Sequence, residues 1–369
     1  MLAWKPSKKV GVGLFTTGMA VSLILAGCGT STAGGSKSAS ASADNGSGNG
    51  NGKLTVVKVA MDNAPAEAGL ILGMKLGYFQ KQGIKVDYEK FASGADMLTS
   101  LASGQIDVAR TVISAGLFNA AARGVPIRLA ADGGQNLPDK PYFALVVSKK
   151  LANKVKDYKD LKGLKVGIAS KGSINEMFLS KALEKGGLTT KDVKEVIVDS
   201  FPDLLTGVKT GAMDAAVQIE PLITSGVDQG VYSWWKNPKD YAPDEEISTI
   251  AYGKKLVDNK DLGNRFMVAY LQGVRAYDDA IIYGNKDRDK IIKILTKETF
   301  VNDPKTYQKM NPPFLDPNGQ IPKDGVVNDQ NWYAAQGMVK KKTNVDNLVD
   351  PSYADYALKK LGKYQKPQK

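Results

Sequence analysis

The sequence predicts an α/β fold on three observations. From residue 54 onward, short β-branched runs alternate with stretches whose apolar residues recur at helical spacing. The composition, with 43% hydrophobic and 24% charged residues, is that of a globular protein, and 369 residues suffice for one large or two medium domains. Strands that alternate with helices form mostly parallel sheets, which bind ligands near the carboxyl ends of their strands.

A first series of elements begins at Leu54–Met61, a β-branched strand, which a helix over Gly69–Phe79 follows. The pattern then predicts, in order, a strand at Ile84–Phe91, a turn at Ser93-Gly94, a helix at Ala95–Ala102, a strand at Ile106–Ala109, a helix at Ser114–Ala122 and a strand at Ile127–Ala131.

A second series consists of strands at Tyr142–Val147, Lys165–Ala169, Val196–Asp199 and Ala215–Ile219, with a helix at Ile174–Lys185. Another strand is expected at Ile247–Tyr252. From Leu262 onward the chain becomes helical, and the lysine-rich end at Lys359–Lys369 is expected to be a solvated tail.

The N-terminal segment has the features of a secretory signal peptide over residues 1–27. Three lysines precede an apolar stretch that is too short to span a bilayer. Leu25-Ala26-Gly27-Cys28 resembles a bacterial lipobox, which implies cleavage before Cys28 and lipid anchoring through that cysteine to the extracytoplasmic face of the cell membrane. Residues 28–52 are rich in glycine, serine and asparagine, so we expect a flexible linker.

The numbers of histidine and cysteine residues exclude several classes of enzyme mechanism. The chain has no histidine and one cysteine, which removes Ser-His-Asp, Cys-His and histidine-metal sites as well as disulfides within the chain. The formal charge of +12 is spread along the chain without a basic stripe among aromatics, so nucleic-acid binding is not expected. Asp316-Pro317-Asn318-Gly319 fits a turn better than a calcium loop, and we expect no catalytic residue, metal or cofactor.

Six short motifs follow one another along the chain: Ala68-Gly69 through Leu76-Gly77-Tyr78-Phe79, Phe91-Ala92-Ser93-Gly94, Leu101–Ala109, Ala120–Ile127, Asp160–Gly167, and Met213-Asp214-Ala215-Ala216 with Glu220-Pro221. Together they resemble type II periplasmic-type binding proteins of ABC importers, in the branch for nitrate, sulfonate, taurine and thiamine-pyrimidine precursors.

The resemblance implies a two-lobed fold with a ligand cleft between the lobes. Residues 53–145 and 247–369 would form lobe one, and residues 146–246 would form lobe two. It also implies a monomeric solute-binding lipoprotein that captures a small polar ligand and delivers it to an ABC permease and ATPase.

Serines and glycines at predicted helix starts are candidate ligand contacts, because free backbone N–H groups there attract anions. Ser170, Gly172 and Ser173 precede the Ile174 helix. Ser93, Gly94 and Ser114 are the counterparts from the opposite lobe. We predict a clamp made by Ser170 and Ser93, while simple helix capping is an equal alternative for Ser173.

Acidic residues at predicted strand ends or helix starts are further candidates, and they favour a ligand with an amine or amide donor. These residues are Asp62, Glu67 and Glu220, and solvated capping is as good an explanation for each. Pyrimidine binders that resemble this chain usually carry an aromatic residue and a histidine where Asn63 and Glu67 stand, so sulfonates or amine-bearing ligands are favoured. Asn63 joins the candidate contacts.

Of two other functions, a ligand sensor remains open and a synthase is disfavoured. A lipoprotein that senses a ligand and signals to a membrane kinase needs the same closing cleft, so the sequence does not separate it from an importer component. A pyrimidine-precursor synthase of this fold supplies substrate atoms from its own histidine, and this chain has none.

Overall fold

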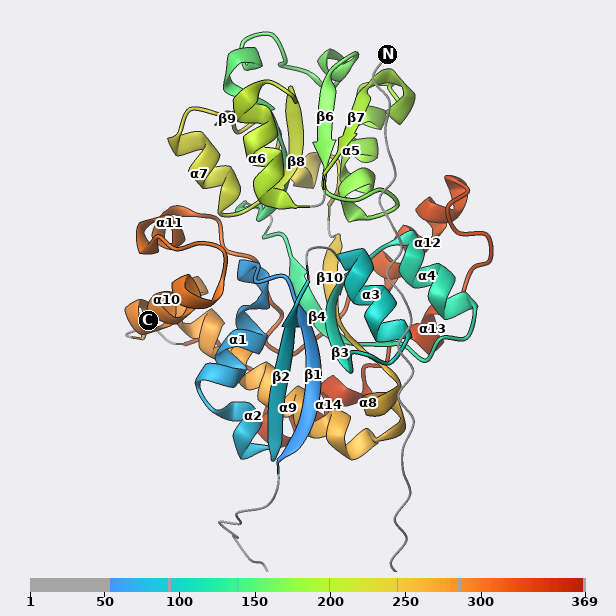
Figure 1. The fold of residues 1–369 in the computed structure, drawn as a ribbon, viewed down its shortest axis with the longest axis vertical. Helices are drawn as coiled ribbons and strands as arrows, with labels where there is room; N and C mark the ends of the chain where they lie inside the picture. The colour runs from blue at the N-terminus through green and yellow to red at the C-terminus, as the bar shows by residue number, and fades with distance from the viewer. Residues whose placement is uncertain are drawn as a thin grey trace, which may run out of the picture. The chain divides into compact units, whose positions relative to one another are not determined.

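The computed structural model describes residues 54–367, apart from 92–93, 138, 199, 244 and 285–286. These residues form two five-stranded sheets, ordered β2-β1-β3-β10-β4 and β7-β6-β8-β5-β9 (Figure 1). We call the first sheet with its helices the first lobe, and the other sheet with its helices the second lobe. The predicted two-lobed α/β fold is confirmed.

The first sheet contains β1 (Thr55–Met61), β2 (Ile84–Lys90), β3 (Val108–Val112), β4 (Arg128–Gln135) and β10 (Glu246–Tyr252). β1 pairs in parallel with β2 and β3, whereas β10 is antiparallel to both β3 and β4. Each strand lies near its predicted position. β3, however, extends beyond the predicted end at Ala109 to Val112, so it includes Arg110.

The second sheet contains β5 (Phe143–Ser148), β6 (Lys165–Ile168), β7 (Lys194–Ile197), β8 (Ala215–Ile219) and β9 (Tyr232–Ser233). β6 is parallel to β7 and β8, while β5 is antiparallel to β8 and β9. Phe143–Ser148 is thus part of the second sheet, and the lobe boundaries at residues 145 and 246 remain a prediction.

In each of the two described sheets, the antiparallel strand is the one through which the chain enters from the other lobe. The chain leaves the first sheet after β4 and enters the second as β5, and it returns as β10. A strand that directly follows a crossing from one lobe to the other runs antiparallel to its neighbours in the sheet that it joins. The expectation of mostly parallel sheets therefore holds, with one reversed strand in each described sheet.

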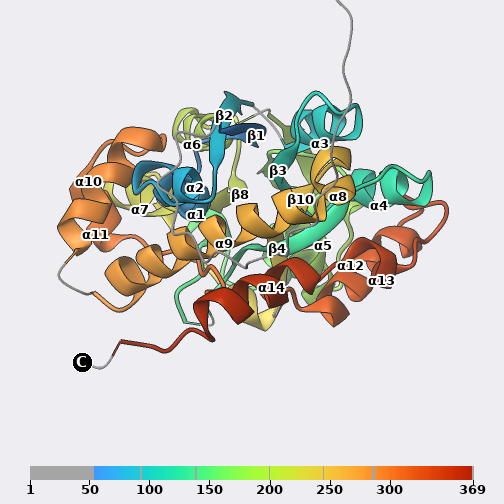
Figure 2. The ribbon, with the colours of Figure 1, turned by 90° about the horizontal axis from the view of Figure 1, so that it is seen from below.

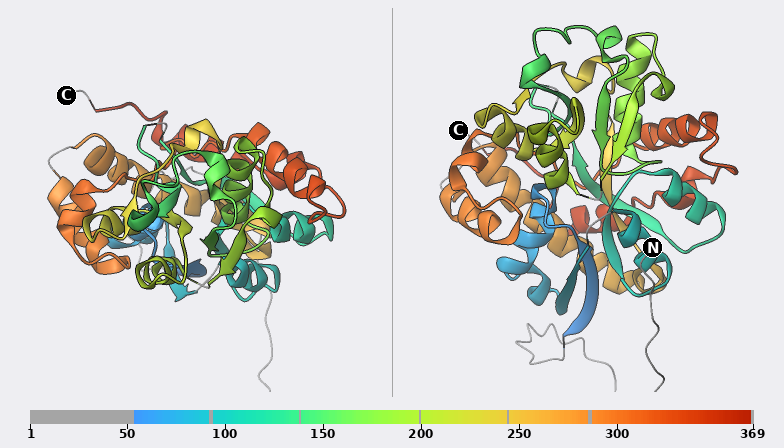
Figure 3. Two further views of the ribbon diagram at one scale, coloured as in Figure 1. Left: turned by 90° about the horizontal axis from the view of Figure 1, so that it is seen from above. Right: turned by 45° about the horizontal axis from the view of Figure 1, so that its top comes forward.

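Helices cover both faces of the first sheet. One face packs against α1 (Ala68–Lys75), α2 (Tyr78–Lys81), α9 (Lys260–Tyr277), α10 (Arg288–Glu298) and α14 (Ser352–Leu361). The other face packs against α3 (Gly94–Ala102), α4 (Ala115–Ala122), α12 (Lys323–Ala335) and α13 (Val345–Leu348), and α12 lies near α4 (Figure 3). α8 (Lys254–Asp258) and α11 (Pro304–Lys309) complete this lobe.

The predicted helix over Gly69–Phe79 is two helices, because Gly77 adopts the left-handed conformation with φ of 75°. In the second lobe, α5 (Ile174–Lys185) has its predicted bounds, and its core residues include Phe178 and Leu183. The opposite side of that sheet packs against α6 (Phe201–Thr210) and α7 (Leu222–Asp228), which the sequence reading did not assign.

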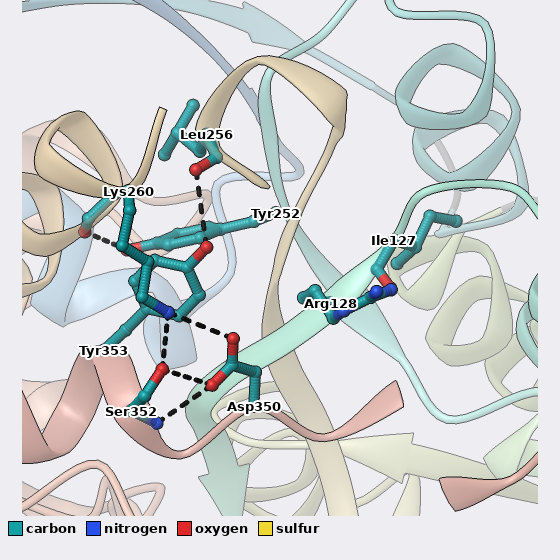
Figure 4. A network of polar contacts seen from close by, with 9 residues as sticks. Ile127, Arg128, Tyr252, Leu256, Lys260, Asp350, Ser352 and Tyr353 are labelled. Carbon is teal, nitrogen blue, oxygen red and sulfur yellow. Dashed lines mark hydrogen bonds and ion pairs between the residues drawn. The ribbon is translucent and has the colours of Figure 1, made fainter. Parts of the chain in front are cut away.

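The C-terminal helix α14 is fixed to the first lobe through polar contacts at Lys260 (Figure 4). Lys260 pairs with Asp350 at 3.1 Å, bonds to Ser352, and lies 3.3 Å from the centre of the Tyr353 ring. Figure 2 shows α9 and α14 running beside each other.

The predicted solvated tail at Lys359–Lys369 has exposed lysines at 359, 360 and 363, but it begins inside α14, and residues up to Tyr364 also contact the fold. Arg275 Nη2 donates to the Gly362 carbonyl at 2.7 Å, and Asn318 Oδ1 accepts from the Tyr364 N–H at 2.9 Å. These contacts join residues that lie far apart in the sequence, so the lysine-rich composition did not indicate them. Within the described residues, no helix has both the length and the apolarity needed to cross a membrane.

Candidate functional site

A cavity of about 300 Å³ lies between the lobes, and residues from both lobes line it. The first lobe contributes Asp62, Lys90, Phe91, Gly94, Met97, Arg110, Val112 and Phe300. The second lobe contributes Ala169, Ser170, Asn175, Ser200, Phe201 and Pro202. Several of these residues follow β1, β2 and β6 directly, which is the edge where α/β sheets bind ligands.

Arg110 brings a buried positive charge to the cavity wall. It lies on β3 with 6% of its surface exposed, and its Nε donates to the Gly133 carbonyl at 3.0 Å. Burial is the largest influence and opposes its ionisation, but the interactions with Asp62, Tyr142 and Glu67, among others, together outweigh burial, and the pKa of Arg110 is raised. The site therefore contains a fixed guanidinium, which suits planar anions.

Two predicted acids lie beside this arginine. Asp62 lines the cavity, and its Oδ1 accepts a hydrogen bond from the Ala64 N–H at 3.0 Å. Glu67 is 1% exposed, and its Oε1 accepts from the Asp62 N–H at 2.9 Å. Burial, followed by the charge of Asp62, raises the pKa of Glu67 well above its usual value, so this carboxyl group holds a proton more readily than an exposed glutamate does.

Aromatic side chains form much of the remaining wall: Phe91, Phe201 and Phe300. Asn63 positions one of them. It adopts φ of 59°, its Nδ2 donates to the Glu298 carbonyl at 2.6 Å, and its own carbonyl accepts from the Phe300 N–H at 3.0 Å. Asn63 is not among the residues that line the cavity, so its observed contacts connect the β1 loop to the segment after α10.

The predicted serine and glycine contacts fall into two groups. Gly94 and Ser170 line the cavity. Ser114, Gly172 and Ser173 instead line a neighbouring hollow of about 510 Å³, which Ser170 also borders. Ser114 caps α4 and Ser173 caps α5. For Ser173 this is the helix-capping role given above as the alternative to ligand contact.

The same segments connect the lobes through backbone hydrogen bonds. The Ala115 N–H donates to the Gly172 carbonyl at 2.9 Å, and the Ile174 N–H donates to the Ile113 carbonyl at 3.2 Å. Lys309 of α11 pairs with Asp228 of α7 at 3.0 Å, which also joins the two lobes. The structure is therefore a closed form of the cleft.

Glu220 is fully buried and is not among the residues that line the cavity. Its Oε2 accepts from the Thr224 N–H at 2.9 Å, and its Oε1 accepts from the Thr224 hydroxyl at 3.0 Å and the Asn311 N–H at 3.2 Å. Burial raises its pKa to about 7. The expectation that Glu220 faces a ligand in the cleft is not met, because the side chain turns back onto its own helix and onto a segment 91 residues away.

Two predicted residues, Ser93 and Cys28, lie outside the described residues, so the clamp of Ser93 with Ser170 stays a prediction. Arg110 was missed, although a lone arginine among Val108, Ala109 and Val112 is the sign of a charge inside a buried strand. Among the described residues, no group of three or more acidic, histidine or cysteine side chains is arranged to hold a metal.

Two α/β lobes with a cavity between them define the periplasmic-binding-protein class of folds, and solved structures agree. The nitrate-binding protein NrtA of Synechocystis PCC 6803 superposes with a TM-score of 0.69 at 18% identity, covering 84% of this chain and 90% of that one. The alkanesulfonate-binding protein SsuA of Xanthomonas axonopodis pv. citri, bound to MOPS, gives 0.65 at 18% identity, covering 82% and 99%.

Residues 64–280, more than half of the 369, match the family described as NMT1/THI5 like, so the chain belongs to this family. A curated relative, the 4-amino-5-hydroxymethyl-2-methylpyrimidine phosphate synthase of Schizosaccharomyces pombe, is 24% identical over 156 residues. That match spans 42% of this chain and 42% of the relative.

Proposed function

We propose that this protein is an extracytoplasmic solute-binding lipoprotein that captures a small ligand between its lobes and delivers it to an ABC permease and ATPase. The observation that carries the proposal is the cavity of about 300 Å³ that both lobes line. A ligand there contacts both lobes at once, so its binding energy favours the closed form.

The structural neighbours support this function, because their names include nitrate-binding and alkanesulfonate-binding proteins. The lipobox-like sequence at Cys28 supports lipid anchoring at the outer face of the membrane, and the proposed protein acts as a monomer. Sulfonates, taurine, nitrate and related amine-bearing or heterocyclic solutes are the candidate ligands. A sensing lipoprotein would differ in its partner, a membrane kinase.

The curated relative is named as a synthase, which makes an enzyme the second candidate. The chain contains no histidine, so general acid-base chemistry near neutral pH would depend on carboxyl, lysine or tyrosine side chains with shifted pKa values. Asp62 is the acid that lines the cavity, and it caps its own loop. We therefore favour binding without chemistry.

Native mass spectrometry of the protein purified from its own host, without refolding, tests the proposal. We expect one bound small molecule, whose removal lowers the melting temperature and whose return restores it. Release of a chemically altered product would support an enzyme instead. Absence of any bound molecule, together with no response to a broad solute panel, would contradict solute binding.

Lipid anchoring has its own test. The wild-type protein is expected in the membrane fraction, and Cys28→Ser is expected to shift it to the soluble fraction without changing ligand affinity. Membrane association that persists in this variant would contradict anchoring through Cys28.

Closure is tested by Ala115→Pro. Ala115 is the first residue of α4, where proline is tolerated, and Ser114 before it is already extended at φ of −153°. Proline removes the hydrogen bond to Gly172 and places its ring against that carbonyl. One hydrogen bond contributes about 0.5–1.5 kcal/mol, so we expect ligand affinity to fall about 3- to 10-fold.

Titration calorimetry measures this loss, and small-angle scattering should show a larger radius of gyration for the ligand-free variant. Ala115→Ser keeps the N–H and is the matched control, which should behave as wild type. Equal affinity of the proline variant and wild type, with both folded, would mean that this contact does not hold the cleft closed.

A further inference from the structure

Arg110 is a buried cation without a close counter-ion. Its residue surface is 6% exposed, and among the described residues no carboxylate lies within 4.0 Å of its guanidinium. Charges at longer range already favour its ionised form, as its raised pKa shows, but no described carboxylate contacts it directly, so a ligand anion can take that place. The arginine lines the cavity, so a ligand can supply this anion.

The described side chains that line the cavity carry one more positive than negative charge, so they favour a ligand with a single negative charge. Among the described residues that line it, Lys90 and Arg110 are cationic and Asp62 is the single acid. Glu67 lies behind the wall, and its raised pKa favours the protonated carboxyl group. The carboxylate oxygens of Glu220 accept hydrogen bonds from Thr224 and Asn311, so they do not face a ligand. Asp62 is thus the one acid among the described lining residues, and the two cations outnumber it.

Unsatisfied polar atoms lie near Arg110. Oε2 of Glu67 and Oγ of Ser248 are buried and have no hydrogen-bond partner among the described residues. A methyl group placed on Gly134 would lie 3.3 Å from Ser248 Oγ and 3.7 Å from Arg110 Nη2, so these two groups share one location. Neither residue is among those that line the cavity, so these atoms describe the polar surroundings of Arg110 behind the wall and are not ligand contacts.

The rest of the cavity suits an apolar body with a flat shape. Phe91, Phe201 and Phe300 contribute three aromatic rings, and Met97, Val112 and Pro202 contribute further apolar surface. Aromatic pairs gain about 0.5–1.5 kcal/mol beyond the burial of their area. A nitrate ion is about the size of two water molecules, roughly 60 Å³, and would leave most of the 300 Å³ unfilled.

Resting on the solute-binding function proposed above, we propose that the cleft selects organic monoanions with an aromatic or heteroaromatic body. The anionic group pairs with Arg110, and the ring lies among Phe91, Phe201 and Phe300. Taurine and nitrate, which the sequence left open as ligands, are poor ligands for this wall, because neither has an aromatic body to lie among the three phenylalanine rings.

Titration calorimetry on the ligand-stripped mature protein tests this proposal. The probes are benzenesulfonate and benzoate as aromatic anions, benzyl alcohol and benzylamine as neutral and cationic analogues, and taurine and nitrate. We expect the aromatic anions to bind at least about 10-fold more tightly than the other four, because hydrogen bonds to a charged group and ring contacts both contribute.

Variants then locate the two parts of the ligand. Arg110→Met is expected to weaken benzenesulfonate binding about 10- to 100-fold, while Arg123→Met, which removes an exposed arginine from the neighbouring hollow, should leave it unchanged. Phe201→Leu should reduce the preference for an aromatic over an alkyl sulfonate and retain the preference for anions. If Arg110→Met does not fold, the Phe201 variant and the probe ranking still decide the question.

Taurine or nitrate binding as tightly as benzenesulfonate, or an Arg110→Met protein that is folded and binds benzenesulfonate as wild type does, would overturn the ligand class and leave solute binding intact. The solute-binding function itself fails by the separate criterion given above, namely no bound molecule from the host and no response to the broad panel.

Discussion

Gly273→Ala is expected to destabilise the protein by about 3 kcal/mol, because helices α1 and α9 touch through their backbones at this position. A Cβ atom on Gly273 would lie 2.1 Å from the Gly69 carbonyl oxygen and 2.8 Å from the Gly73 nitrogen. Backbone atoms cannot rotate away as a side chain can, so the two helices would have to separate. Alanine's better helix propensity recovers at most about 1 kcal/mol.

Chemical denaturation measures this effect, with Gly116→Ala as the matched control on α4. There the added Cβ would lie 3.3 Å from the end of the Leu98 side chain and 3.8 Å from Ser114 Oγ, and neither contact is with backbone, so the control should be neutral or slightly stabilising. An unfolding free energy of Gly273→Ala equal to that of wild type would show that the helices do not approach as closely as the structure has them.

Lys181→Met should cost about 3–5 kcal/mol at pH 8, because it leaves buried carboxyl groups without their cation. Lys181 on α5 pairs with Glu245, which precedes β10, and its charge also acts on Asp329 of α12. Both Asp329 oxygens are buried without a hydrogen-bond partner among the described residues. The cluster therefore spans the two lobes and the segment that joins them.

The loss should shrink as the pH falls. Burial raises the pKa of Asp329 to about 7, above its unfolded value near 4. A carboxyl group with a raised folded-state pKa stabilises the fold fully below its unfolded pKa, and this contribution is lost as the pH rises through the folded value. Protonation between pH 7 and 5 removes the unpaired charge, so Lys181→Met should be closer to wild type at pH 5.

Urea unfolding at pH 5 and pH 8 gives both free energies. Lys162→Met is the control, since its pair with Asp192 spans 3.9 Å at the surface and should contribute little to stability at either pH. Adding Asp329→Asn to Lys181→Met should recover part of the loss at pH 8. A loss that is the same at both pH values would contradict a titrating cluster.

The strands and the first helices could be predicted because their signals are local. The β-branched run that forms β1 and the apolar spacing of α5 lie within a dozen residues, and both elements appear at or near the expected bounds. Gly77 was a local signal that the helix predicted over Gly69–Phe79 ends early, because a glycine in the left-handed conformation stops a helix.

The site was predictable only in part, because its geometry depends on distant partners. Asp62, Gly94 and Ser170 line the cavity, as strand ends in such a sheet should. The orientation of Glu220 depends on Asn311, and the position of Phe300 depends on Asn63, at separations that no sequence period reveals. Arg110 was within reach of the sequence, because a charge inside a buried strand requires an explanation.

The pairing of β4 with β10 has a mechanical consequence. The two connections between the lobes leave the first sheet from neighbouring strands, at the end where Gln135 lies opposite Glu246 and the register is irregular. Two adjacent tethers favour rotation about an axis that runs through both of them. One interatomic distance across the cleft, followed by a pair of spin labels, should then report how far the lobes have rotated.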